Sequence, residues 1–171
     1  MRVRRHTAAL IITSALFAAG VVAPADAQTG KGPGNGNANG HQKLHCRAFH
    51  ASGVGVDAGN GTTTAIIYRG NRAIGTTFGT FEPGVPDADG VLPFTGSIDF
   101  TNDKGTLVAP VVGTLDTVTG EFVSTSDSVT GTDGYADVTG RLTFAGVQEI
   151  GGINFTETVH GKLCVPKKKQ H

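Results

Sequence analysis

The chain contains two cysteines, Cys46 and Cys164, and their positions restrict the fold more than any other feature of the sequence. Two cysteines allow one intramolecular pairing, and a disulfide requires Cα atoms within about 7 Å of each other. The segments that begin and end the predicted folded region must then be neighbours. A row of antiparallel strands whose first and last members are adjacent forms a closed barrel. A β-sandwich is the alternative, because strand periodicity alone does not distinguish the two architectures.

The start of the chain has the features of an export signal. Three arginines precede an apolar run over residues 8–22, and Ala25 and Ala27 supply the small residues of a cleavage site. A membrane anchor is the competing interpretation, but the run is short for a span of about 20 residues. We therefore predict a signal peptide over residues 1–27 and a secreted, extracellular protein, in which a Cys46–Cys164 disulfide would persist.

The rest of the chain divides by composition into three parts. Residues 28–43 are rich in Gly and Asn and predict a flexible leader, residues 44–165 a single β-barrel domain, and residues 166–171 a solvated basic tail. Without the three signal-peptide arginines and Asp26, the 14 basic and 14 acidic residues become 11 and 13. This near-neutral balance gives no support to a nucleic-acid partner, and we predict none.

The region from Leu44 onward has the pattern of an all-β protein. No window of eleven or more residues shows a 3.6-residue apolar period. Thr, Val, Ile and Phe dominate instead, and glycines interrupt these runs. Turn-forming stretches rich in Gly, Asp and Asn separate long strands, which is typical of a meander that closes on itself. We predict an eight-stranded antiparallel β-barrel with strands over residues 44–49, 62–69, 73–81, 91–100, 106–115 with a break at Pro110, 121–130, 135–145 and 153–164.

Alternation assigns the two faces of these strands. In the stretch FTGSIDF, residues 94–100, the Phe, Gly and Ile positions share one face and the Thr, Ser and Asp positions share the other. Gly96 and Gly140 fall on apolar faces, where a missing side chain permits the curvature of a barrel. With no Trp and only two Tyr, the chain lacks the aromatic girdles of an outer-membrane barrel. We therefore predict no stable membrane insertion.

Residues 131–140, GTDGYADVTG, resemble the G-T-G-x-F-x-x-A-x-G type segment found in dirigent proteins and in the related allene oxide cyclase-like barrels. The resemblance covers roughly residues 91–164. It implies an eight-stranded antiparallel barrel with a cavity at its mouth, often assembled as a homo-oligomer. Asp133, Tyr135 and Val138 depart from the pattern, and the polar residues that the plant proteins use on their substrates have no match in this chain. The resemblance therefore carries over the fold and not the activity.

Two acidic residues are predicted to face the barrel interior and are our ligand-binding candidates. Glu157 shares the apolar face of the last strand with Ile153, Phe155, Val159 and Leu163. Asp127 shares a face with Val123, Thr125 and Val129. A carboxyl group in such surroundings has a raised pKa and can anchor a ligand or transfer a proton. The alternative is that a bulge reverses the register near one of them, or that each lies hydrated at a rim.

The remaining polar residues do not form a recognisable catalytic set. No His has a spacing that suggests nucleophilic catalysis, so we predict no catalytic residues. His45, Cys46 and His50 are metal-ligand types, but their separations place them on different strand faces, so we predict no metal and no cofactor. The leading hypothesis is binding of a small apolar molecule in the barrel mouth. The alternatives are an isomerase- or cyclase-like or dirigent-like enzyme that acts by confinement, and a structural or surface-interaction module.

Overall fold

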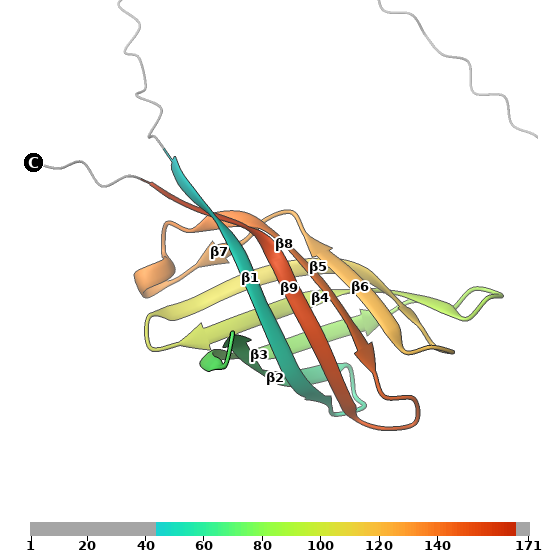
Figure 1. The fold of residues 1–171 in the computed structure, drawn as a ribbon. Coiled ribbons are helices and arrows are strands. Elements are labelled where there is room, and N and C mark those ends of the chain that lie inside the picture. Colours follow the sequence, from blue (N-terminus) through green and yellow to red (C-terminus); the bar gives the residue numbers. More distant parts are fainter. Residues whose placement is uncertain (1–43, 167–171) are drawn as a thin grey trace, which may run out of the picture. The chain divides into compact units, whose positions relative to one another are not determined.

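The computed structural model describes residues 44–166 (Figure 1). The predicted signal peptide, the leader and residues 167–171 of the tail lie outside the described residues. Strands dominate, and the helical content is one 3₁₀ turn, η1 (Asp133–Tyr135). The strands are β1 (Leu44–Asp57), β2 (Thr62–Arg69), β3 (Arg72–Pro83), β4 (Val91–Asn102), β5 (Gly105–Asp116), β6 (Glu121–Ser126), β7 (Thr130–Gly131), β8 (Thr139–Gln148) and β9 (Asn154–Pro166).

Eight of these strands close into an antiparallel barrel, as predicted. Each strand pairs with its neighbours in the order β1, β2, β3, β4, β5, β6, β8, β9, and the two-residue β7 adds to β5 outside this ring. The ring closes where β9 pairs with β1, from Leu44 opposite Pro166 to Val56 opposite Asn154 (Figure 1). The sandwich alternative is therefore wrong, because every barrel strand has a hydrogen-bonded partner on both sides.

The predicted disulfide is present and lies at this closure. Cys46 is directly opposite Cys164, with 3.9 Å between their Cα atoms, and their sulfurs are bonded. The two residues are 118 positions apart in the sequence. The bond thus joins the first and last strands, which is the adjacency that the cysteine positions predicted.

Two strands are longer or more continuous than predicted. β1 continues to Asp57, eight residues beyond the predicted end at Phe49. The prediction was too short because the inward positions in this part are Gly53 and Gly55, which supply no large apolar side chain to the alternation. β5 passes through Pro110 without a break. On the edge of β5 that faces away from β4, β7 pairs up to Val108 and β6 pairs from Val112 onward. Pro110 lies in the gap between these two pairings, where a residue without an N–H is tolerated.

The region between residues 121 and 145 differs more from the prediction. β6 ends at Ser126, and the stretch predicted to begin a strand at Tyr135 instead forms η1, with β8 starting at Thr139. In β6 the inward positions are Phe122, Ser124 and Ser126 rather than Val123 and Thr125. Burying the ring of Phe122 gains more than burying Val123, which is consistent with this register.

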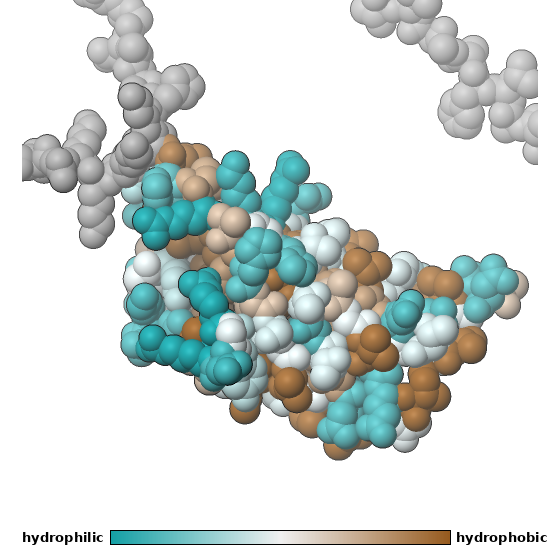
Figure 2. Space-filling model, viewed as in Figure 1, coloured by the Kyte–Doolittle hydropathy of each residue, from teal (hydrophilic) through white to brown (hydrophobic). Residues whose placement is uncertain are grey.

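Side chains fill one part of the barrel interior, and a cavity lies at one end. The main buried cluster contains Ile98, Leu107, Ala109, Val111, Val129, Val138, Leu142, Phe144 and Val159. The outer face that carries β1 and β9 mixes hydrophilic and hydrophobic residues (Figure 2). Within residues 44–166 the structure contains no helix of the length and apolar character needed to cross a membrane.

Candidate functional site

The barrel contains a cavity of about 260 Å³ at one end, which we call the mouth cavity. It opens where the β1–β2, β3–β4, β5–β6 and β8–β9 connections meet. Backbone hydrogen bonds tie these connections together, from Thr117 N to Gly90 O, from Gln148 N to Gly120 O and from Asp57 N to Ile153 O. The volume is close to the lower end of the range of pockets that hold small molecules.

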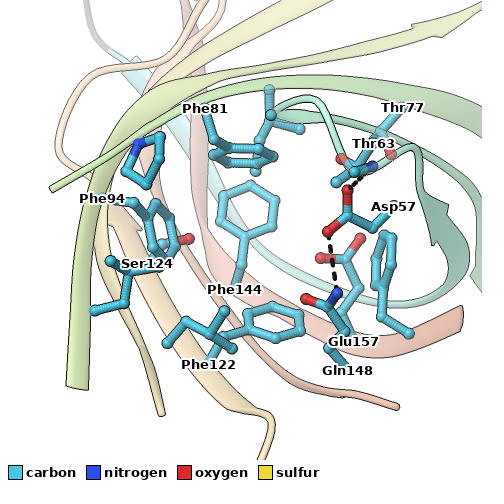
Figure 3. A pocket seen from close by; sticks show the side chains of 17 residues that line it. Asp57, Thr63, Thr77, Phe81, Phe94, Phe122, Ser124, Phe144, Gln148 and Glu157 are labelled. Carbon is cyan, nitrogen blue, oxygen red and sulfur yellow. Dashed lines mark hydrogen bonds between the residues drawn. The ribbon is translucent and has the colours of Figure 1, made fainter. Parts of the chain in front are cut away.

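Five phenylalanines contribute to the cavity wall. They come from β3, β4, β6, β8 and β9, namely Phe81, Phe94, Phe122 and Phe144, which Figure 3 labels, and Phe155. Phe81 contacts Phe94 edge to face with 5.4 Å between ring centroids, and Phe122 contacts Phe155 in the same manner at 6.1 Å. Such pairs hold their rings in fixed orientations, so the wall is preformed.

Glu157 projects from β9 into this apolar cavity, as the alternation of the last strand predicted (Figure 3). Its neighbours on the inward face, Phe155 and Val159, are buried, and Glu157 itself is only 8% exposed. No residue of the described chain donates a hydrogen bond to its carboxyl group, and desolvation by burial raises the pKa of Glu157 from 4.5 to about 7. The carboxyl group is therefore a polar anchor that is free to bind a ligand.

Glycines on both neighbouring strands lie opposite Glu157, and Gly53 makes room for its side chain. Gly53 of β1 and Gly146 of β8 lie opposite Glu157 on either side. A Cβ at Gly53 would come within 2.7 Å of both Cγ and Oε1 of Glu157. Glycine at this position therefore determines where the carboxyl group can lie. Gly53 was not among the predicted site residues, because the first strand was predicted to end at Phe49.

A second carboxylate lies at the rim of the cavity and was not predicted from the sequence. Asp57, at the end of β1, accepts a hydrogen bond from Gln148 Nε2 at 3.0 Å and another from the backbone N–H of Gly59 at 2.8 Å. The bond from Gln148 connects β1 to β8 (Figure 3), whereas the bond from Gly59 is local to the β1–β2 connection. Asp57 has the same parity as the inward Gly53 and Gly55, so the signal was present once β1 is extended.

Asp127 does not reach the interior, and the predicted orientation is wrong. β6 ends one residue before it, and its side chain is 88% exposed and lies 3.7 Å from Arg141 in a surface ion pair. The inward parity in β6 belongs to Phe122 and the even-numbered serines. The structure thus brings Glu157 into the cavity together with Asp57 rather than with Asp127.

The histidines near Cys46 form no metal cluster. Cys46 is in the disulfide, and the part of the chain that the structure describes contains no group of three His, Cys, Asp or Glu arranged to hold a metal ion. His50 lies across the strand pair from His160, with their Nδ1 atoms 2.8 Å apart.

Comparison with known proteins adds no family assignment. No family model matches the chain, and no curated protein matches it either.

Proposed function

We propose that this protein is exported and binds a small, largely apolar molecule in the mouth cavity, with the Glu157 carboxyl group as the polar contact. The observation that carries the proposal is a cavity with phenylalanine rings in its wall into which the Glu157 carboxyl group faces without a hydrogen bond from the described residues. Its oxygens are accessible from the cavity, since no side-chain oxygen of residues 44–166 is both fully buried and without a partner. A ligand that hydrogen-bonds to this carboxyl group in the apolar cavity therefore gains free energy. The unfilled cavity is also the reason to prefer binding over a purely structural role.

Three features support the exported, dirigent-like part of this proposal. The start of the chain has the pattern of a signal peptide, the cysteines form a disulfide, and the barrel is the fold that the resemblance implies. Disulfides persist in oxidising compartments. The same resemblance implies that the barrel assembles as a homo-oligomer, and we include this assembly in the proposal.

A second candidate function is an isomerase- or cyclase-like reaction by confinement. It is favoured by the burial of Glu157 in a cavity with apolar walls, which raises the pKa of its carboxyl group to about 7. A general acid or base works best when its pKa is near the working pH. In this version Glu157 transfers a proton within a ligand that the phenylalanines hold in a reactive conformation.

Indole is a suitable first probe because the chain contains no Trp, so indole fluorescence reports the probe alone. We expect indole to bind and its emission to shift to the blue, as its N–H meets the Glu157 carboxyl group. Ser124 is buried in the cavity wall, and Ser124→Leu should fill the space and abolish binding. Glu157→Gln should weaken binding, and the surface variant Asp127→Asn should leave it unchanged.

The same variants separate the two candidate functions. If a substrate is turned over, Glu157→Gln should remove turnover while a bound molecule is still detected by native mass spectrometry. If the wild type and Glu157→Gln both bind the molecule and neither turns it over, the binding function is supported and the enzymatic one is not. Failure of indole and of any co-purified molecule to occupy the folded wild-type barrel would refute the proposal.

A further inference from the structure

The two ends of the barrel differ in charge. The end away from the cavity carries basic residues together with Asp103, Asp127, Asp133 and Asp137, whereas the end around the cavity carries no basic residue of the described chain. The connections and strand ends around the cavity carry only acidic residues among their charged side chains, namely Glu82, Asp87, Asp89, Asp116, Glu121 and Glu149 in addition to Asp57. Across residues 44–166, every Lys and Arg lies at or towards the other end, at Arg47, Arg69, Arg72, Lys104, Arg141 and Lys162. The protein is close to neutral overall, so this separation makes the cavity entrance locally negative.

The cavity interior has the same sign. Its lining contains two acidic residues, Asp57 and Glu157, and no Lys, Arg or His from any of the eight barrel strands. Asp57 already accepts bonds from Gln148 and Gly59, whereas Glu157 has no partner among the described residues. The aromatic walls add to this effect, because the face of a phenylalanine ring is the negative part of its quadrupole.

We propose that the ligand of the mouth cavity is an organic cation: an amine or quaternary ammonium group on a small apolar body. The inference rests on the proposed binding function and specifies the chemical class of its ligand. The ammonium group would pair with the Glu157 carboxylate and contact the ring faces, while the apolar body fills the rest of the cavity. The acidic entrance would attract cations and repel anions during approach.

A neutral alcohol satisfies less of this site. Its hydroxyl group can donate one hydrogen bond to Glu157, but it leaves the negative potential of the two carboxylates and the acidic entrance unbalanced. A carboxylate ligand would be repelled by both. Charge complementarity therefore orders the three ligand classes as cation, neutral molecule and anion.

Cation binding should be coupled to the ionisation of Glu157. The titratable group that faces it from the packed elements is Asp57 on β1, and the other strands contribute none to the cavity lining. A bound cation favours the charged form of Glu157 and lowers its pKa, so a proton is released. The affinity for a cation should accordingly rise as the pH increases through about 7, the pKa of free Glu157.

The test compares three ligands with the same phenyl body: phenethylamine, phenethyl alcohol and hydrocinnamate, each measured by displacement of indole. At pH 8 we expect the amine to bind about tenfold more tightly than the alcohol, which corresponds to about 1.4 kcal/mol and is within the range for a desolvated cation–aromatic contact. The acid should bind least. At pH 5.5 the preference for the amine should fall at least threefold, and calorimetry near pH 7 should detect proton release with the amine only.

Matched variants locate the effect. Glu157→Gln should remove the pH dependence of the amine preference. Glu82→Gln with Glu121→Gln, two exposed acids at the entrance, should weaken amine binding two- to threefold in dilute buffer and lose this effect in about 0.5 M salt, where charges are screened. The control pair is Asp127→Asn with Asp137→Asn at the other end, which should change nothing.

The outcomes separate this inference from the binding function on which it rests. If the alcohol binds as tightly as the amine, or the acid binds best, the cation assignment is wrong and the binding function stands. If none of the three ligands nor indole enters the folded barrel, both are wrong.

Discussion

Replacement of Glu157 by Gln should make the barrel more stable at neutral pH. The pKa of Glu157 rises from 4.5 to about 7 on folding because the side chain is buried with no partner. At about 1.36 kcal/mol per pKa unit, ionising this group in the folded state costs about 3 kcal/mol. Below pH 4.5 the group is protonated in both states and the cost is absent. Stability is therefore lost as the pH rises from 4.5 through 7.

The measurement is the free energy of unfolding in urea for the wild type and Glu157→Gln, with the disulfide intact, at pH 4.5, 6 and 8. The difference between the two proteins isolates this group, because all other titrations are common to both. We expect nearly equal stabilities at pH 4.5 and an advantage of about 3 kcal/mol for Glu157→Gln at pH 8. A difference between the two proteins that stays constant with pH would refute the burial argument for Glu157. A wild type that gains stability relative to Glu157→Gln as the pH rises would show that folding lowers the pKa of Glu157 rather than raising it.

Three other substitutions test separate parts of the structure. Gly53→Ala places a Cβ within 2.7 Å of the Glu157 side chain, so it should displace the carboxyl group, weaken indole binding and cost about 1–3 kcal/mol in urea unfolding; unchanged binding would contradict this. Asp127→Asn removes one exposed ion pair and should change stability by less than about 0.5 kcal/mol; a larger loss would mean that the side chain is not at the surface. Replacing Cys46 and Cys164 by Ser removes a link between residues 118 positions apart and should lower the free energy of unfolding by about 4–5 kcal/mol. A loss below about 1 kcal/mol would contradict the view that the disulfide stabilises the barrel by restricting the unfolded chain.

The β architecture was accessible from the sequence because its signals are local. Side chains alternate strictly across a strand, so the inward position of Glu157 followed from its place between Phe155 and Val159. The turns followed from Gly, Asp and Asn, and closure of the barrel followed from the two cysteines. Each of these inferences needs only near neighbours in the chain or one covalent link.

The errors fall where an inward position is held by a small or polar residue. Because Gly53 and Gly55 occupy the inward positions, the second half of β1 was not predicted as a strand, and Asp57 was not predicted as a site residue. In β6 the inward residues include the polar Ser124 and Ser126, so hydropathy predicts the face with Val123 to be inward and places Asp127 on the wrong side. Hydropathy reports transfer from water, whereas inside a barrel the space left by the neighbouring strands decides which residue fits.

The sequence alone determined the faces of strands such as β4 and β9, the closure of the barrel and the inward position of Glu157, because these depend on the period of the strand and on the cysteines. The absence of basic residues from the turns at the cavity end is also a property of the sequence, since alternate turns of an antiparallel meander share an end. Only the tertiary structure showed that Glu157 lies between Gly53 and Gly146 and near Asp57. The pairing of Gly53 with Glu157 depends on the register between β1 and β9, which lie about 100 residues apart in the chain, and no local pattern specifies that register.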